Sequence, residues 1–394
     1  MKIAIFTETY LPYINGVVTH VKILREGLIN MGHEVLIITA DTSLKTHTLE
    51  NGILRCPALE LRNLYGYGLA SPVSRAVENT IREFNPDVIH IEQEFSLGLE
   101  GMRCARKLKL PLIYTLHTLY DYYIYYIAPR PFTDVVKKIS HRYIRFFARR
   151  ADIITGPSEK CQDYLKSMGV TRKLHVIPNP VEMESYGKGA VSEEERRSLR
   201  NALNIPDDAF LGCFCGRLGK EKMADELIKI YKENLTDNDY LLILGDGPSR
   251  PELTHMAKYL GVEDRIIFTG AIPHEKLAPY YAISDYYATA SVSDTYSISM
   301  LEAQASGLYV LQKYDIKNAY QTRQNINGEL FTTGDDFRKI VEKLKNLSQE
   351  EKDELSERVI DSVKMRSSEA VAKSMSQLYS IAIEKNKNKH KDVL

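Results

Sequence analysis

The feature that most constrains the fold is an alternation of short β-branched segments and longer helical patterns, which runs through the chain twice. The short segments of the first half are mainly apolar, as expected of strands buried on both faces of a parallel sheet. They are Lys2–Phe6, Glu34–Thr39, Val88–Ile91, Leu112–Leu116 and Ile153–Gly156. Strands that alternate with helices in this way predict a doubly wound α/β domain.

The same alternation begins again after residue 209. Its predicted strands are Phe210–Gly216, Tyr240–Gly245, Arg265–Thr269, Asp285–Ala290 and Tyr309–Leu311. A chain of 394 residues exceeds the usual size of one hydrophobic core, and an apolar content of 44% is enough for two. We therefore expect an α/β protein with two Rossmann-like domains.

Two prolines mark the passage between the domains. Pro178 and Pro180 flank Asn179, and this segment cannot continue a helix. The predicted organisation is an N-terminal domain over residues 1–185 and a C-terminal domain over 186–365. A helix over 366–384 is expected to return to the first domain, and the polar tail 385–394 has no apolar face and is expected to be disordered.

Charge and cysteine content argue against several classes of function. Lys and Arg number 23 against 19 Asp and Glu over residues 1–185, and 29 against 33 over the rest, so no nucleic-acid partner is expected. Five scattered cysteines predict neither a disulfide framework nor a four-ligand metal site. The first apolar run is too short for a secretory signal and no segment is long enough to span a membrane, so we expect a cytoplasmic protein.

Two cations follow the first strand of the second domain. Arg217 and Lys222 lie where an open parallel sheet presents its ligand site. Two cations alone are typical of a solvated basic loop. However, turn residues such as Gly245 close the next strands and add backbone amides to the same edge. Together these features suit a diphosphate group that is neutralised without a metal.

Two carboxylates lie further along the chain. Asp294 and Glu302 flank the start of a helix expected at about 296–306, whose N-terminal amides favour an anion. Acidic residues before a helix are also ordinary caps, so Asp294 alone could be one. Its spacing to Glu302 and to the cationic pair favours a functional role, in which the two carboxylates hold sugar and ribose hydroxyls.

These motifs resemble those of the retaining GT-B glycosyltransferases of family 4, over residues 1 to about 384. The family holds the donor diphosphate with a paired Arg and Lys, and the sugar and ribose with a Glu-x7-Glu element. Arg217, Lys222 and Glu302 match, whereas Asp294 replaces the first Glu and is one methylene shorter. The family's Gly-Phe-Gly is replaced by Thr295-Tyr296-Ser297, which with Ile298 would contact the donor. The resemblance implies GT-B architecture, with two doubly wound domains facing a cleft.

Two segments of the first domain extend the resemblance. Tyr13–His20 is similar to the family's glycine loop, in which Gly16 would face the donor phosphate, although Asn-Gly is also a common turn. His117 resembles the family histidine that touches the transferred sugar, although a lone histidine at a strand end is usually structural. The resemblance therefore gives His117 and Asp294 the catalytic role of positioning the sugar.

A tyrosine-rich region indicates the subgroup. Glu94–Gly98 and Tyr114–Ile127 resemble the bacterial diacylglycerol glucosyltransferases of the family. Tyrosine suits a site where lipid meets sugar, because its ring is apolar and its tip polar, but core tyrosines are an equal alternative. The resemblance implies acceptor contacts from Glu94, Tyr120, Asp121 and Tyr123.

The segment Val135–Arg150 has the pattern of a basic amphipathic helix. Such a helix either lies on an anionic membrane surface or packs on its own domain. Its expected apolar face is Val135, Val136, Ile139, Tyr143, Phe146 and Phe147. Its expected basic face is Lys137, Lys138, His141, Arg142, Arg145 and Arg149.

The resemblance implies transfer of a hexose, expected to be glucose from UDP-glucose, to diacylglycerol or a related glycolipid on the inner face of the cytoplasmic membrane. No metal or other cofactor is expected, because Asp237-Asn238-Asp239 has the form of a metal-binding pair but falls in a turn before a strand. Two alternatives remain open. One is a family 4 enzyme with a soluble or polymer-linked sugar acceptor, and the other is a nucleotide-sugar-binding protein without transfer activity.

Overall fold

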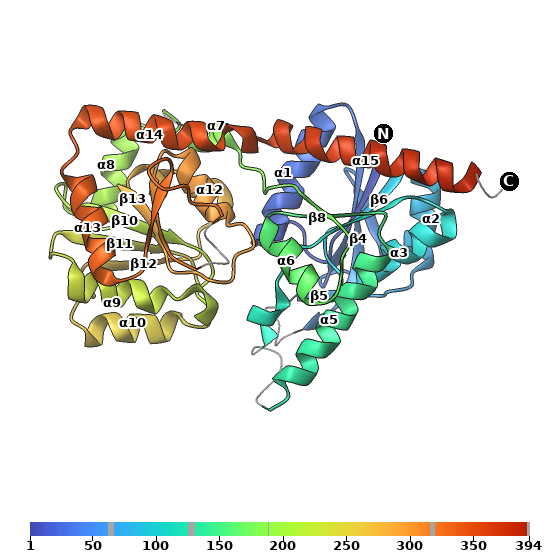
Figure 1. Cartoon of the computed structure of the whole chain (residues 1–394), viewed down its shortest axis with the longest axis horizontal. Coiled ribbons are helices and arrows are strands. Elements are labelled where there is room, and N and C mark those ends of the chain that lie inside the picture. Colours follow the sequence, from blue (N-terminus) through green and yellow to red (C-terminus); the bar gives the residue numbers. More distant parts are fainter. Residues whose placement is uncertain (62–66, 125–130, 188, 316–319, 392–394) are drawn as a thin grey trace. The chain divides into compact units, whose positions relative to one another are not determined.

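The chain forms two compact α/β units in a computed structural model that describes residues 1–61, 67–124, 131–187, 189–315 and 320–391 (Figure 1). The N-terminal unit comprises Met1–Pro180 and the returning segment from Ser368, and the C-terminal unit comprises Val181–Ser367. The division therefore follows Pro180, whereas the sequence placed it after residue 185. Across these ranges, none of the helices combines the length and apolarity that a membrane crossing requires.

The N-terminal unit is built on one sheet with the strand order β3-β4-β2-β1-β6-β7-β8-β9, and β5 pairs with β4. β3 and β5 run antiparallel to β4, and the other pairs are parallel. The strands are β1 (Lys2–Phe6), β2 (Glu34–Asp41), β3 (Thr48–Glu50), β4 (Ile53–Leu61), β5 (Tyr67–Ala70), β6 (Val88–Ile91), β7 (Leu112–Thr115), β8 (Ile153–Gly156) and β9 (Leu174–Val176).

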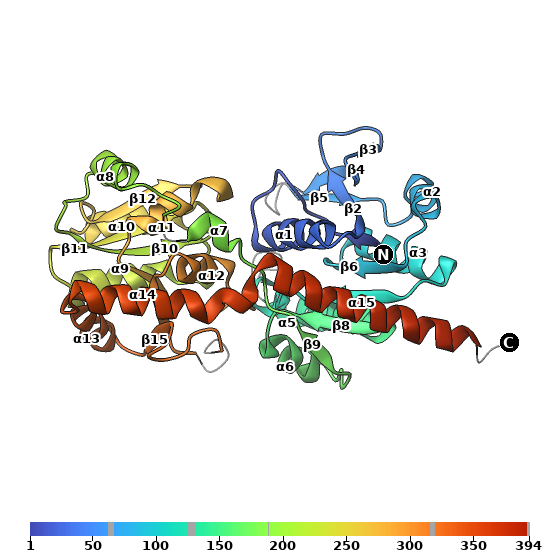
Figure 2. The same cartoon turned by 90° about the horizontal axis from the view of Figure 1, so that it is seen from above.

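Helices cover both faces of this sheet because alternate residues of each strand point to opposite sides. Ala4 and Phe6 pack with α2 (Arg75–Phe84), α3 (Ser96–Leu108), α5 (Thr133–Arg150) and α6 (Glu159–Ser167). Ile3 and Ile5 pack with α1 (Gly16–Asn30) and α15 (Ser368–Lys391). Figure 2 shows α1 beside α15, and Gly27 permits this approach because a Cβ there would lie 2.8 Å from the carbonyl oxygen of Ser368.

The last helix corrects one prediction. Residues 385–391, expected to be disordered, continue α15, and 392–394 lie outside the described residues. A helix that is already nucleated on a packed face gains one hydrogen bond for each residue it adds, so a polar extension can remain helical. In addition, Asn386 Nδ2 donates to the carbonyl oxygen of Lys109 at 2.7 Å, which ties this extension to the N-terminal unit.

The C-terminal unit has a fully parallel sheet with the strand order β12-β11-β10-β13-β14-β15. Leu241 and Ile243 point to one face, and Leu242 and Leu244 point to the other. The strands are β10 (Phe210–Cys215), β11 (Asp239–Leu244), β12 (Ile266–Gly270), β13 (Tyr286–Thr289), β14 (Tyr309–Lys313) and β15 (Gly328–Phe331). The helices are α7 (Met183–Tyr186), α8 (Glu193–Ala202), α9 (Ala224–Asn234), α10 (Arg250–Tyr259), α11 (Ala278–Ala282), α12 (Ile298–Ala305), α13 (Gly334–Lys345) and α14 (Gln349–Val363). The prediction of two Rossmann-like domains is confirmed.

Candidate active site

The strand order defines one topological switch point in each sheet. The order changes direction between β1 and β6 in the N-terminal unit, and between β10 and β13 in the C-terminal unit. Open α/β sheets bind their ligands at the carboxyl ends of the strands that flank such a point. The sequence candidates follow these strands or their neighbours: Gly16 after β1, His117 after β7, Arg217 and Lys222 after β10, and Asp294 after β13.

Glycine at position 245 allows the ends of β10 and β11 to meet. Gly245 has a φ of +141°, and a Cβ there would lie 2.0 Å from the carbonyl oxygen of Gly216. Only glycine tolerates so close a backbone approach. The amide of Leu218 donates to the carbonyl oxygen of Asp246 at 2.9 Å. The loop that carries Arg217 is therefore fastened to the end of β11.

The cationic pair is held by carboxylates. Arg217 Nη2 donates to Glu221 Oε1 at 2.8 Å, and Glu221 is only 6% exposed. Lys222, in the 3₁₀ segment Lys220–Lys222, places its Nζ 2.5 Å from Asp294 Oδ1. The hydroxyl of Ser291 donates to the other oxygen of Asp294 at 2.6 Å. The structure thus brings together two predicted site residues, Lys222 and Asp294, that lie 72 positions apart.

The N-cap of α12 is Ser297 and not Asp294. The helix begins at Ile298, and its N-cap is Ser297, whose hydroxyl accepts from the amide of Met300 at 3.3 Å. Gln321 fixes this cap, because its Oε1 accepts from the amide of Ser297 at 2.8 Å and its Nε2 donates to the carbonyl of Ser297 at 2.7 Å. Asp294 is therefore not the helix cap. Thr295 and Tyr296 line a small cavity beside Asp294.

Glu302 is buried inside the C-terminal unit at 3% exposure. Its Oε1 lies 2.7 Å from His274 Nε2, and its Oε2 accepts from the hydroxyl of Tyr281 at 2.9 Å. His274 belongs to the 3₁₀ segment His274–Lys276, and Tyr281 belongs to α11. A carboxylate oxygen can accept more than one hydrogen bond, so both oxygens retain capacity for a ligand hydroxyl.

The glycine loop of the N-terminal unit is also fixed by side chains. Asn15 caps α1, its Oδ1 accepting from the amide of Val18 at 3.0 Å, so Gly16 is the first helical residue. Gln93 Oε1 accepts from the amide of Thr9 at 2.8 Å and from the hydroxyl of Thr7 at 2.9 Å. The segment between β1 and α1 is therefore tied to the end of β6.

His117 belongs to a buried cluster of histidines around one carboxylate. Glu92 is 1% exposed, and its Oε2 lies 2.6 Å from His117 Nε2. His90 Nδ1 and His20 Nε2 lie 3.4 and 3.8 Å from the other oxygen. Burial alone would raise the pKa of Glu92, but the surrounding histidines outweigh it and hold this pKa below its usual range. Burial lowers the pKa of His20 to about 4, so its ring is neutral at pH 7.

The same cluster has the donor types of a metal site. Within the described ranges, His20, Glu92 and His117 bring three such donor atoms within 4.8 Å of one another. Two ligands of a tetrahedral zinc ion lie about 3.3 Å apart. The 2.6 Å between His117 and Glu92 is instead a hydrogen-bond distance. In the segment Asp237-Asn238-Asp239, interpreted as a turn in the sequence, Asp239 begins β11 at the opposite edge of its sheet and accepts from the amide of Thr236 at 2.9 Å.

The predicted acceptor residues form structural contacts. Glu94 is 3% exposed and accepts from the hydroxyls of Tyr114 and Tyr120. Asp121 accepts from Tyr164 at 2.9 Å and pairs with Lys137 at 2.8 Å, and His141 Nε2 lies 2.7 Å from it. These carboxylates fasten the 3₁₀ segment Tyr120–Tyr122 to the elements around it, and their assignment to an acceptor stays a prediction. The amide of Tyr123 donates to the carbonyl oxygen of Tyr120 at 2.8 Å, and the rest of the tyrosine-rich stretch, 125–130, lies outside the described residues.

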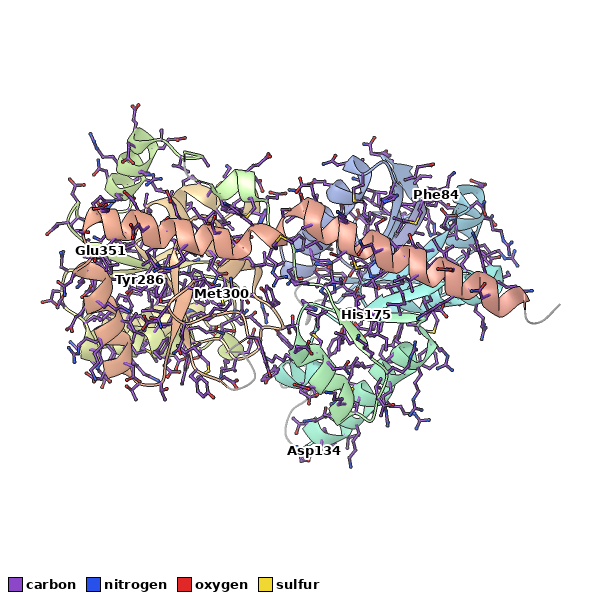
Figure 3. The ribbon with its side chains drawn as sticks, turned by 45° about the horizontal axis from the view of Figure 1, so that its top comes forward. Phe84, Asp134, His175, Tyr286, Met300 and Glu351 are labelled. Atoms are coloured by element: carbon purple, nitrogen blue, oxygen red, sulfur yellow. The ribbon has the colours of Figure 1, made fainter. Side chains whose placement is uncertain are left out.

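Helix α5 is buried along only part of its length. Ile144, Phe147 and Ala148 are buried, whereas Val135 and Ile139 are 56% and 63% exposed. The predicted apolar face is therefore covered by the domain only along its C-terminal turns, because the N-terminal turns extend beyond the sheet (Figure 1), where Asp134 is labelled in Figure 3. The predicted basic residues Lys138, Arg142 and Arg149 are exposed, Lys137 is exposed but paired with Asp121, and Arg145 is half-buried.

Comparisons with known proteins agree along the whole chain. Residues 14–185 match the family described as Glycosyltransferase Family 4, and residues 195–366 match Glycosyl transferases group 1. The alpha-monoglucosyldiacylglycerol synthase of Acholeplasma laidlawii is 30% identical over 398 residues, covering 99% of each chain. The synthase of the same name from Streptococcus pneumoniae is 32% identical over 318 residues, covering 79% of this chain and 70% of that one. The solved structure of Anabaena HepE in complex with UDP-glucose has a TM-score of 0.74 and 18% identity, covering 96% of this chain and 99% of that one.

Proposed function

Because this chain belongs to the family 4 glycosyltransferases of GT-B fold, we propose that it transfers glucose from UDP-glucose to diacylglycerol or a closely related glycolipid, with retention of configuration. The names of the two synthases support the acceptor, and the HepE complex supports the donor. The observation that carries the proposal is the pairing of Lys222 with Asp294 beside Arg217, at the switch point of the C-terminal sheet.

The cations act on charge that grows on the leaving diphosphate. Lys222 has three N–H donors, so one can remain on Asp294 while the others reach phosphate oxygens. Glu221 holds the guanidinium of Arg217 in a fixed orientation. Each charge-assisted hydrogen bond to phosphate contributes about 1.5–3 kcal/mol. The N-terminal amides of α12 add the favourable potential of a helix terminus.

In the proposed reaction, the bond between the anomeric carbon and the phosphate oxygen breaks and the acceptor oxygen attacks from the same face. The proton of the acceptor hydroxyl passes to the departing phosphate. Positive charge on the sugar and negative charge on the diphosphate then develop together, and Arg217 and Lys222 stabilise the latter in the transition state. His117 and Asp294 position the sugar.

The reaction mixture that tests this function contains UDP-[¹⁴C]glucose, diacylglycerol in vesicles and excess chelator. We expect a labelled glucosyl lipid, and the same rate with and without chelator, because cationic side chains neutralise the diphosphate. Label transferred only to a soluble or polymer-linked sugar supports the first alternative. Donor binding without hydrolysis or transfer, across a panel of acceptors and of other nucleotide-sugars, supports a binding protein.

The exposed end of α5 supports a membrane-associated site for a lipid acceptor. Phe132, Val135 and Ile139 are each more than half exposed, and the exposed cations Lys138 and Arg142 lie on the same helix. Apolar side chains next to cations favour the interface of an anionic bilayer, which attracts each cation by about 1 kcal/mol. We therefore place the protein at the membrane surface as a peripheral protein.

Replacing Lys138 and Arg142 together by Gln is expected to weaken binding to vesicles that contain anionic lipid by about 30-fold, from about 2 kcal/mol of lost attraction. Flotation of the protein with such vesicles measures this change. The matched control replaces Lys339 and Lys343 by Gln, because both are exposed cations on α13. Equal binding by the α5 variant and the α13 variant would argue against this membrane contact.

A further inference from the structure

A buried carboxylate lies directly behind the candidate sugar-positioning residue. Glu92 follows β6, the strand at the switch point of the N-terminal sheet, and His117 follows the adjacent strand β7. The 2.6 Å between Glu92 Oε2 and His117 Nε2 is a short charge-assisted contact, and the two side chains are 0% and 6% exposed. Solvent therefore screens this pair very little.

The surroundings of Glu92 are not those that would stabilise the fold best. Its Oε1 is buried without a hydrogen-bond partner among the described residues. A buried acceptor left in this state costs stability, and a well-packed apolar side chain is often more stabilising than a buried ion pair. Groups of this kind persist at functional sites, so the position calls for a role beyond folding.

The contact determines where the proton of His117 lies. An ionised carboxylate only accepts hydrogen bonds, so Nε2 of His117 carries the hydrogen. His20 restrains the ring from a second side, since the two ring centroids are 4.7 Å apart in an edge-on arrangement. His20 is itself placed by Asn179, whose Oδ1 is 3.0 Å from His20 Nδ1. Both the tautomer and the orientation of His117 are therefore fixed by neighbouring side chains.

We propose that Glu92 is the positioning residue for His117, holding its imidazole as the Nε2–H tautomer so that the opposite edge of the ring meets the transferred hexose. This inference rests on the proposed function, which gives His117 its contact with the sugar. Glu92 itself does not touch the substrate. Its effect on the reaction passes through the ring.

Glu92→Gln keeps the size of the side chain and removes its charge. We expect kcat to fall about 10- to 100-fold, as for residues that orient a functional histidine, with the KM for UDP-glucose within about threefold of the wild-type value. The melting temperature should fall, because the lowered pKa of Glu92 means that its ionised form stabilises the fold, so kcat is measured per folded protein. In ¹⁵N NMR, His117 of the wild-type protein should show a protonated Nε2, and the variant should show a mixture of tautomers.

Glu100→Gln is the matched control. Glu100 lies on α3, is 0% exposed, and accepts from Arg103 Nε at 2.7 Å and from Arg103 Nη2 at 2.6 Å. Its activity per folded protein should stay within about threefold of wild type, as for a buried carboxylate that does not touch His117. Unchanged kcat in Glu92→Gln, or a loss equal to that in Glu100→Gln, would overturn the proposal.

The NMR measurement separates this inference from the proposed function. If the wild-type protein has no transferase activity, the proposed function is contradicted. The effect of Glu92 on the protonation of His117 can still be measured by NMR in that case. An unprotonated Nε2 in the wild-type protein, or the same tautomer in Glu92→Gln, would overturn the role of Glu92 whatever the activity.

Discussion

Lys222→Ala is expected to lower kcat by about 10²–10³-fold, the loss typical of removing one fixed donor from a developing negative charge. Arg217 cannot replace the ammonium group on the diphosphate with the same geometry, since its guanidinium is held by Glu221. The free energy of unfolding should hardly change. The Lys222–Asp294 pair is partly exposed, at 16% and 26% of the two side chains, and such pairs contribute at most about 1 kcal/mol. Initial rates at saturating UDP-glucose and thermal melting of the same preparation measure both quantities.

Lys229→Ala is the control for this prediction. Lys229 lies on α9 and pairs with Asp225 at 3.1 Å, so the substitution also removes a lysine and an ion pair from the C-terminal unit. Its activity should equal that of the wild-type protein. A Lys222→Ala protein whose loss of activity matches its loss of folded protein would contradict a role in the reaction.

Asp294→Ala is expected to lower kcat/KM by at least about 100-fold, because it removes the candidate sugar contact and the partner that orients Lys222. Asp294→Glu should retain at least about a tenth of the activity. The cavity beside Asp294, lined by Thr289, Gln312 and Tyr296, can accept part of the extra methylene. Initial rates over a range of UDP-glucose concentrations give kcat and KM for each variant.

The double variant Lys222→Ala/Asp294→Ala shows whether the pair acts as a unit. If it does, the double variant should lose about as much activity as the more damaged single variant, because residues that work together have non-additive effects. A loss in the double variant equal to the product of the two single losses would show that the residues act independently.

Most strands of both sheets could be predicted because buried parallel strands are mainly apolar. The missed strands lack this signal. β3 and β5 are short antiparallel strands beside β4, β9 has only three residues, and β15 has the sequence Gly-Glu-Leu-Phe without a β-branched residue. In β4, Arg55, Pro57 and Glu60 interrupt the apolar pattern. The helical periodicity of α5 could also be recognised in the sequence. However, the sequence could not predict that only its C-terminal turns are covered, because that depends on where the sheet ends.

The candidate donor residues could be placed because most of them follow a strand that flanks the switch point or the strand next to it. Their hydrogen-bond partners could not be predicted from the sequence. A hydrogen bond such as the one between Gln321 and Ser297 joins distant segments and leaves no local sequence pattern. The capping residue of α12 was equally ambiguous until Ser297 was seen to take that place. For Glu92 a signal did exist, since a charged residue directly after the apolar run Val88–Ile91 marks the end of a buried strand.

The central claim is that Arg217 and Lys222 hold the diphosphate of a nucleotide-sugar, and a crystal structure of the protein with bound UDP tests it most directly. We predict that phosphate oxygens lie within hydrogen-bonding distance of the Arg217 guanidinium and of Lys222 Nζ, with the ribose hydroxyls on Glu302. A diphosphate bound elsewhere, with both cations still directed only at Glu221 and Asp294, would contradict it.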